Sequence, residues 1–372
     1  MSQMYWNLIE KSKRIKGVMT LLGGDPDFNT PKHIRDAATK ALEDGWTHYP
    51  SIGGISELKE ALAKYHKRYG TNWNSSDEVI VTAGALPALY LSLLGTLSRG
   101  DEVVLFEPFY MGYKPLIDYL GCTGITVKLR EEKGYHFEME ELYESVTSKT
   151  RMILICSPNN PTGTVFTEKE LSGIAELAQE KDLFILSDEI YDQFIWDDLK
   201  HHSIASQSGM KEKTLVITSF SKTFSMTGWR LGSIMADKSI ISSLRKIPLG
   251  GRPATFIQKA GVAALKGPWD PIIEFRREYN KRKKYLSKRL NEIEGISCTN
   301  PEGAFYLFPN LKATGQKAVD LCEGLLEKQK FATVPGTEFG DAGEYHVRLP
   351  LVKPIEYLTK CADAMEDYIK HI

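Results

Sequence analysis

One stretch organises the chain, Leu215-Val216-Ile217-Thr218-Ser219-Phe220-Ser221-Lys222. Its first four residues are apolar or β-branched and predict a buried strand. Lys222 follows the end of that strand among small hydroxyl residues, at the position where open α/β sheets bind their ligands. Partial burial and a second cation such as Arg230 would lower the pKa of the Lys222 amine, which would let it form a Schiff base with a carbonyl group. Because a single lysine is more often solvated in a loop, this hypothesis depends on the rest of the chain.

Strands and helices alternate regularly around this stretch. The predicted strands cover 78–82, 103–106, 125–127, 152–156, 183–186 and 215–218, and the predicted helices cover 87–97, 113–120, 139–146 and 168–180. Strands this apolar, separated by helices, are typical of a mostly parallel sheet with both faces covered. A further strand over 231–235 follows too closely for a helical crossover, so we expect it to run antiparallel. The fold class is therefore α/β, with a large domain built on a mostly parallel seven-stranded sheet covered by helices.

The two ends of the chain predict a smaller α+β domain. Residues 1–30 hold no long periodic segment, and Thr30-Pro31 resembles an N-cap followed by Pro at the first position of a helix to Leu42. After the boundary at Pro268–Pro271, helices are predicted over 272–293 and 318–328 and to Ile372, and strands over 304–308, 331–334 and 346–349. We expect a large domain of residues 31–269 and a small domain made of residues 1–30 and 270–372.

Composition narrows the class of protein and its partners. The 372 residues are 42% hydrophobic and 26% charged, which is ordinary for a globular protein with a full core. The net charge of -1 gives no global attraction to nucleic acid or to an anionic membrane. We recognise no secretory signal and no apolar run long enough to span a membrane. The five scattered cysteines favour reduced thiols and a cytoplasmic location.

Polar or aromatic residues follow several of the predicted strands. Gly84-Ala85-Leu86 precedes a helix, where backbone N–H groups can bind a phosphate, although this signal is weak alone. Tyr110 follows the next strand and can stack on a planar ring. Asn160 lies between prolines, and Asn160-Pro161 is a candidate cis bond. Asp188 directly follows an apolar strand and needs a buried partner, such as a protonated ring nitrogen, with Tyr191 three residues further on.

Two other patterns are weaker. His201-His202 follows Asp197-Asp198 and would suit a metal ion, but the ligand spacing is poor and a solvated loop is the favoured interpretation, so no metal is predicted. The basic helix from Arg276 to Arg289 resembles a nucleic-acid patch, yet its interspersed glutamates favour a solvated helix that connects domains.

Together with Lys222, the polar residues beyond the strands are the parts that a pyridoxal phosphate (PLP) site requires. At this point the sequence resembles the class I/II aminotransferases, PLP-dependent enzymes of fold type I that include aspartate aminotransferase, over essentially the whole chain. The resemblance is carried by Gly24-Asp25-Pro26-Asp27-Phe28, Tyr49, Asn159-Asn160-Pro161-Thr162-Gly163, Ser187-Asp188-Glu189-Ile190-Tyr191, Ser219-Phe220-Ser221-Lys222, Gly228-Trp229-Arg230 and His346-Val347-Arg348-Leu349.

The resemblance implies a role for each matching residue around the cofactor. Lys222 is implied as the Schiff-base lysine and proton shuttle, and Asp188 as the partner of the pyridine nitrogen. Tyr191 and Asn160 are implied to bond the phenolic oxygen, and Tyr110 to stack on the ring. The remaining cofactor-binding residues, mostly at the phosphate, are implied to be Gly84, Ala85, Leu86, Ser219, Ser221, Arg230 and Tyr49, the last from the second subunit of a homodimer.

Substrate binding is implied for Arg348, whose bidentate fork suits the α-carboxylate, with Gly24 and Asn160 beside it. Arg252, in the stretch Gly250-Gly251-Arg252, is open between two roles. It can supply a cation for an acidic substrate side chain, or it can pair with a nearby carboxylate or solvent. The sequence leaves the preferred amino donor open among aspartate, aromatic amino acids, alanine and a broad range.

The implied function is transfer of an amino group between an L-amino acid and a 2-oxo acid, with 2-oxoglutarate as the expected acceptor, by a ping-pong mechanism through a Lys222 Schiff base. A carbon–sulfur β-lyase or a decarboxylase could use the same Lys, Asp and Arg and remains the alternative. A non-enzymatic effector-sensing module is disfavoured, because such modules carry an added DNA-binding domain and the fold is expected to begin within the first thirty residues.

Overall fold

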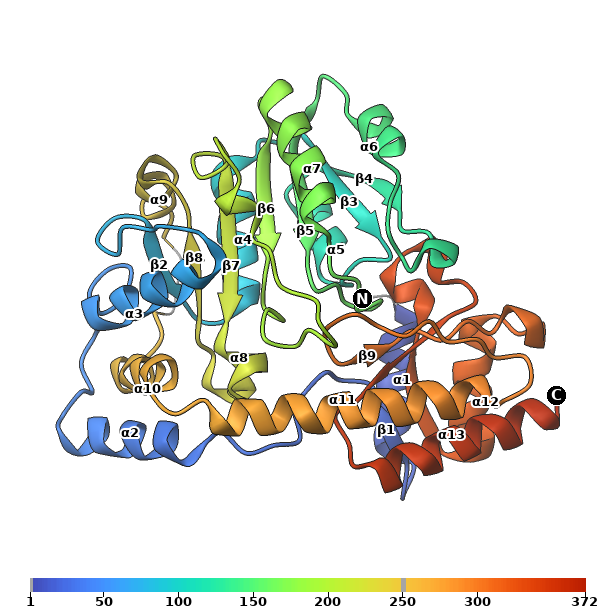
Figure 1. Cartoon of the computed structure of the whole chain (residues 1–372). Helices are drawn as coiled ribbons and strands as arrows, with labels where there is room; N and C mark the ends of the chain where they lie inside the picture. Colours follow the sequence, from blue (N-terminus) through green and yellow to red (C-terminus); the bar gives the residue numbers. More distant parts are fainter. Residues whose placement is uncertain (1–2, 249–251) are drawn as a thin grey trace.

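The computed structural model describes residues 3–248 and 252–372 and is built around two sheets (Figure 1). The larger, seven-stranded sheet has the order β2-β8-β7-β6-β5-β3-β4. Its strands are β2 Val79–Thr82, β3 Glu102–Glu107, β4 Thr123–Lys128, β5 Thr150–Cys156, β6 Phe184–Asp188, β7 Thr214–Ser219 and β8 Gly232–Met235. Only β8 runs antiparallel to its neighbours β2 and β7. The predicted α/β class, the series of strands and the antiparallel strand are confirmed.

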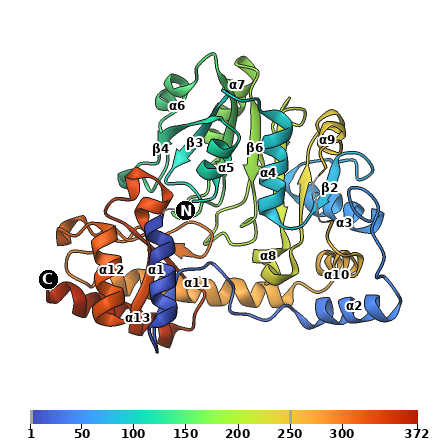
Figure 2. The same cartoon turned by 180° about the vertical axis from the view of Figure 1, so that it is seen from behind.

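Helices cover both faces of this sheet, as Figures 1 and 2 show from opposite sides. One face packs against α4 Ala85–Thr96, α5 Tyr113–Tyr119 and α9 Lys238–Leu244. On the other face, α2 Lys32–Glu43, α3 Ser56–His66 and α10 Thr255–Lys266 pack beside β2 and β8, and α6 Met139–Ser145 and α7 Glu168–Glu180 pack toward the other edge. The interior strands β5 and β6 are buried except at Arg151 and Phe184, because both faces of the sheet are covered.

The second sheet has the order β1-β10-β11-β9. It consists of β1 Met19–Leu21, β9 Tyr306–Leu307, β10 Phe331–Pro335 and β11 Val347–Pro350, with α1 Gln3–Arg14, α12 Ala318–Gln329 and α13 Ile355–Lys370 packed around it. The long helix α11 Asp270–Asn291 runs from the large sheet to this smaller unit (Figure 1). Its Arg282 is buried and forms ion pairs with Asp27 and Glu278. The basic helix was expected to be solvated, and this part of it is not.

The prediction that residues 1–30 lack a periodic segment was wrong. Helix α1 buries Tyr5, Leu8 and Ser12, which are spaced as on one face of a helix. The buried face is a single line of residues, too narrow to give a clear helical period in the sequence. Strand β1 also escaped detection, because three residues have no period to recognise and depend on parallel pairing with β10.

Some predicted boundaries also differ. Helix α4 begins at Ala85, two residues before the predicted start at Pro87, because the turn at Gly84 already directs the chain into the helix. Thr30 does not cap α2; its hydroxyl donates to the carbonyl oxygen of Ser225 at 2.6 Å, and Pro31 occupies the N-cap. Three X–Pro bonds in residues 3–248 and 252–372 are cis, among them Asn160-Pro161 as predicted.

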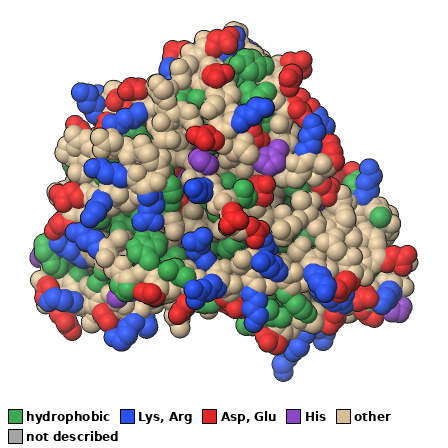
Figure 3. All heavy atoms as spheres, in the orientation of Figure 1, with side chains coloured by type: hydrophobic (Ala, Val, Ile, Leu, Met, Phe, Trp, Pro, Cys, Tyr) green, Lys and Arg blue, Asp and Glu red, His purple; other side chains and the backbone are tan. Residues whose placement is uncertain are grey.

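The surface and the thiols agree with the composition. Acidic and basic side chains are interspersed over the face drawn in Figure 3. All five cysteines are buried and free. Within the described residues, no helix is both long enough and apolar enough to cross a membrane.

Candidate active site

A cavity of about 440 Å³ lies where the carboxyl ends of the parallel strands face the smaller sheet. Its walls include most of the residues predicted to form the site. Those that line it are Gly24, Ala85, Leu86, Tyr110, Asn160, Asp188, Tyr191, Ser219, Ser221, Lys222, Arg230 and Arg348. These residues come from loops far apart in the sequence, and they meet because parallel strands end at one edge of the sheet.

Lys222 lies in the short helix α8 Phe220–Thr223, directly after β7. Its Nζ donates to the carbonyl oxygen of Gly24 at 2.7 Å. Burial, followed by the charge of Arg348, lowers the pKa of the Lys222 amine to about 8. Arg230, the cation expected from the sequence, also lowers this pKa, but less than Arg348. A substantial fraction of the amine is therefore neutral near pH 8 and available as a nucleophile or base.

Asp188 ends strand β6 and points its carboxylate toward the same cavity. The hydroxyl of Tyr113 donates to Oδ2 at 2.7 Å and the N–H of Ile190 donates to Oδ1 at 3.3 Å. Burial raises the pKa of Asp188 to about 6, although the Tyr113 hydrogen bond opposes the rise. No cation described in the structure lies within ion-pair distance of Asp188. A buried carboxyl of this kind is suited to share a proton with a ring nitrogen.

The part of the cavity at the start of α4 has features of an anion site. Gly84 has a φ of 97°, and a Cβ there would lie 2.5 Å from Nη2 of Arg230. The absent side chain therefore lets the guanidinium approach the start of α4, where the N–H groups of Ala85 and Leu86 have no intrahelical partner. Ser219 lies beside them, with its Oγ accepting from the N–H of Ser221 at 3.2 Å. Backbone N–H groups, a hydroxyl and a cation together suit a phosphate.

Arg348 on β11 is a buried cation that lacks a carboxylate partner among the described residues. Its Nη1 donates to Oδ1 of Asn160 at 3.2 Å and its Nη2 to the carbonyl oxygen of Leu22 at 2.8 Å. Its Nε is buried and has no hydrogen-bond partner in the described part of the chain. A buried guanidinium is costly unless an anion accompanies it, so this side chain is poised to bind a carboxylate.

Several aromatic residues of the cavity were not singled out from the sequence. Tyr306 on β9 lies 2.7 Å from Tyr191 between hydroxyl oxygens, and Arg348 lies 4.7 Å from its ring centroid. Tyr113 supports Asp188, and Tyr5 from the unpredicted helix α1 lines the cavity. The strand containing Tyr306 was predicted, but a strand pattern does not reveal which ring faces a distant tyrosine.

Three predicted residues do not line the cavity. One is Gly84, which directly precedes the lining residue Ala85; the others are Tyr49 and Arg252. The side chain of Tyr49 is 96% exposed and lies in a separate surface hollow. Arg252 is exposed, and its Nη1 donates to the carbonyl oxygen of Pro50 at 3.0 Å, so the rest of its guanidinium is open to solvent in this protomer. Gly250 and Gly251, the neighbours of Arg252, lie outside the described residues. Any role of Tyr49 or Arg252 in a site requires a second subunit.

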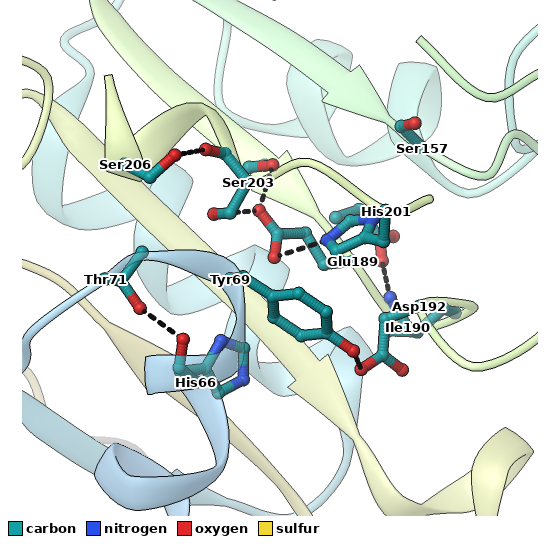
Figure 4. A network of polar contacts seen from close by, with 12 residues as sticks. His66, Tyr69, Thr71, Ser157, Glu189, Ile190, Asp192, His201, Ser203 and Ser206 are labelled. Atoms are coloured by element: carbon teal, nitrogen blue, oxygen red, sulfur yellow. Dashed lines mark hydrogen bonds and ion pairs between the residues drawn. The ribbon is translucent and has the colours of Figure 1, made fainter. Parts of the chain in front are cut away.

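The interpretation of His201 as a solvated loop residue was wrong. Figure 4 shows His201 pointing into a buried network around Glu189. Its Nε2 lies 3.0 Å from Oε2 of Glu189, while the hydroxyls of Ser187 and Ser203 donate to Oε1. Glu189 needs these partners because it is buried directly beside Asp188 in the chain. Among the described residues, no group of three or more His, Cys, Asp or Glu could hold a metal ion.

Comparison with known proteins places the whole chain in a well-populated group. Residues 16–364 match the family model described as aminotransferase class I and II. The chain is 39% identical to an aspartate aminotransferase of Pyrococcus horikoshii, over 96% of this chain and 92% of the relative. It is also 39% identical to aromatic-amino-acid aminotransferase 2 of Thermococcus litoralis, over 98% and 94% of the two chains. The solved structure of an aromatic aminotransferase from Pyrococcus horikoshii matches with a TM-score of 0.93 and 40% identity, covering 98% of this chain and 99% of that one.

Proposed function

The chain belongs to the class I and II aminotransferase family and is a PLP-dependent aminotransferase, and from this premise we propose how its residues perform the reaction. We propose that it transfers an amino group from an L-amino acid to 2-oxoglutarate by a ping-pong cycle. The two halves of such a cycle use one site in turn, so a single set of residues must accept both substrates.

The donor set in the cavity fits PLP. When bound, this cofactor supplies an aldehyde that reacts with amines and a ring that withdraws electrons from the substrate Cα. The fit is supported by the lowered pKa of Lys222, by the buried carboxyl of Asp188 without a cation, and by the cradle that Gly84 leaves open beside Arg230. Lys222, Asp188 and Arg230 line one cavity, as the aldehyde, ring nitrogen and phosphate of a single cofactor would require.

The proposed roles follow from the position of each side chain. Lys222 carries the cofactor and then, as a free amine, moves the proton at the substrate Cα. Asp188 keeps the ring nitrogen protonated, while Tyr191 and Asn160 donate to the phenolic oxygen. Tyr110 stacks on the ring. The phosphate is bound by Ser219, Ser221, Arg230 and the N–H groups of Ala85 and Leu86.

Arg348 binds the α-carboxylate of the substrate in this proposal. Substrate binding would supply the anion that the buried guanidinium lacks, and the bidentate geometry would fix the orientation of Cα relative to Lys222. Gly24 lies on the same side, with its carbonyl oxygen on Nζ of Lys222. Two substrates of different side chain can share this contact because both carry the same carboxylate.

The choice of amino donor depends on the remaining walls. The only cations that line the cavity in the described protomer are Lys222, Arg230 and Arg348, and each already has a role. A further cation for an acidic side chain would have to come from a second subunit, for which Arg252 is the candidate. We therefore propose a homodimer in which Tyr49 reaches the partner's phosphate site. The names of the relatives make aspartate and aromatic amino acids the first donors to test.

We also propose a cytoplasmic location, which the free cysteines support.

One observation carries the proposal: a lysine of lowered pKa, a buried aspartate and a buried, unpaired arginine line the same cavity. The test is a panel of L-amino acids with 2-oxoglutarate, followed through the visible absorbance of the holoenzyme and through glutamate formation. Aminotransfer predicts a spectral change with the donor and recovery on adding 2-oxoglutarate. Release of ammonia without glutamate would instead favour a lyase, and a spectrum unchanged by every amino acid would exclude both.

A further inference from the structure

Tyr306 contacts two groups to which the proposed mechanism gives roles, and has itself no role so far. Its hydroxyl oxygen lies 2.7 Å from that of Tyr191, and its ring lies under the guanidinium of Arg348. It is 1% exposed. Its hydroxyl has no hydrogen-bond partner other than Tyr191 among the described residues. This tyrosine is therefore built into the wall between the substrate side and the cofactor side of the cavity.

The backbone of Gly24 holds the Tyr306 hydroxyl in place. A Cβ at position 24 would lie 2.0 Å from that oxygen, closer than any real contact. Only glycine therefore lets the loop pack over the phenol. The ring is held between this loop and Arg348, so the hydroxyl has little freedom to leave Tyr191.

Counting protons decides the direction of the bond between the two tyrosines. Either hydroxyl can donate when the cavity is empty. Each hydroxyl has one proton and can also accept. In the proposed function, the Tyr191 hydroxyl donates its one hydrogen bond to the phenolic oxygen of the cofactor. Towards Tyr306 it can then only accept, so Tyr306 must be the donor of the bond between the two tyrosines.

We infer that Tyr306 is a positioning residue that donates its hydroxyl proton to Tyr191 and thereby orients and strengthens the hydrogen bond from Tyr191 to the cofactor. This inference rests on the proposed function, because it needs a cofactor at Tyr191. Hydrogen bonds in a chain polarise one another, so a hydroxyl that accepts a bond donates more strongly. In this role Tyr306 acts through Tyr191 and does not itself move the proton at the substrate Cα.

The test is the pH titration of the visible band of the resting holoenzyme, which is independent of turnover. A donor to the phenolic oxygen stabilises its anionic form. When that donor is weakened, the oxygen holds a shared proton more tightly, and the protonated form persists to higher pH. We expect Tyr306→Phe, which keeps the ring under Arg348, to raise the midpoint by about 0.5 pH unit, a fraction of one hydrogen bond.

A matched control separates this effect from the loss of any buried phenol. Tyr279 is fully buried and its hydroxyl has no hydrogen-bond partner in the described residues. It also does not line the cavity. Tyr279→Phe is expected to leave the titration midpoint where it is in the wild type. Thermal unfolding of both apoproteins reports any general loss of stability.

A double-mutant cycle with Tyr191→Phe tests whether Tyr306 acts through Tyr191. The inference predicts that Tyr306→Phe shifts the midpoint in the wild type and adds nothing in the Tyr191→Phe background. Equal shifts in both backgrounds, or a Tyr306→Phe titration that coincides with the Tyr279→Phe control, would overturn it. If Tyr191→Phe itself does not move the midpoint, the proposed contact of Tyr191 with the cofactor fails first, which distinguishes the two failures.

Discussion

Single residues in the cavity carry charges whose burial is costly until a ligand binds. Lys222 and Arg348 are cations and Asp188 is an acid, and none of them has an ion-pair partner among the described residues. Burial and then the like charge of Arg348 destabilise the protonated amine of Lys222 and lower its pKa, while Asp188 has the opposite effect. Such a site is stabilised by a ligand that brings an anion to the arginine and a base to the aspartate.

The pH dependence of cofactor capture follows from Lys222. Only the neutral amine attacks the aldehyde, and burial with Arg348 lowers the pKa of this amine to about 8 in the empty site. The rate at which the apoprotein reacts with PLP should therefore rise with pH and level off above about pH 8. Stopped-flow absorbance measures this rate. Arg348→Met should move the profile to higher pH, since it removes a charge that lowers the pKa of Lys222.

Lys222→Ala should still bind PLP but show no such pH profile and no turnover. Retained turnover would contradict the assignment of Lys222.

Asp188 provides a second prediction at this scale. Asp188→Asn keeps a group of the same shape beside Tyr113 but cannot hold a proton on the ring nitrogen as an anion does. We expect kcat to fall on the order of 100-fold or more. Steady-state rates with each donor and 2-oxoglutarate give the value. A wild-type kcat in this variant would mean that Asp188 is not the group that keeps the ring nitrogen protonated.

Among the secondary-structure elements, α4 begins at the proposed phosphate site. Gly84 lies between β2 and α4 with a φ of 97°, and its missing side chain leaves room for Arg230 beside the first turn of α4. Neither a helix propensity nor a strand pattern reports such a fit. The sequence predicted the helix and the turn at Gly84, but it placed the start of the helix at Pro87.

Gly84→Ala tests this arrangement, with Gly100→Ala as its matched control. Both glycines have φ above 90°, so each substitution should cost about 1–3 kcal/mol of stability through backbone strain. A Cβ at Gly100 meets nothing within 4 Å, whereas one at Gly84 meets Arg230. Equilibrium dialysis should show weaker PLP binding for Gly84→Ala only. Equal PLP affinity in the two variants would remove the anion-site interpretation of this turn.

In the whole molecule, the two sheets draw on separate parts of the chain. The large sheet uses residues between 79 and 235, and the smaller one uses β1 together with residues after 305. We propose the division into residues 31–269 and residues 1–30 with 270–372 on this basis. Helix α11 spans both, since Ile272 packs with the core beneath β2 and β8 while Leu286 packs with the smaller sheet. The cavity lies between the two units, so their relative position sets its width.

A homodimer makes a specific prediction for Tyr49. Because its side chain is 96% exposed, Tyr49→Phe should leave the folding of the protomer unchanged. If its hydroxyl reaches the partner's phosphate site, the variant loses one hydrogen bond, and its affinity for PLP should fall by about 3- to 10-fold. Fluorescence titration of the apoprotein measures the affinity, with sedimentation to confirm the dimer. An unchanged affinity in a confirmed dimer would remove Tyr49 from the site.

The sequence alone determined the α/β class, the succession of strands along the chain and the choice of Lys222 and Asp188, whereas Arg348 was implied by the resemblance to the aminotransferases. These features are local, because burial on both faces leaves continuous apolar strands and because polar residues directly after such strands are unusual. Tertiary structure alone decided that Tyr113 supports Asp188, that Tyr306 meets Tyr191, that His201 is buried, and that Tyr49 and Arg252 lie outside the cavity of their own protomer. Periodicity shows that a face is buried, but the partner of a side chain is set by how elements far apart in the sequence pack together.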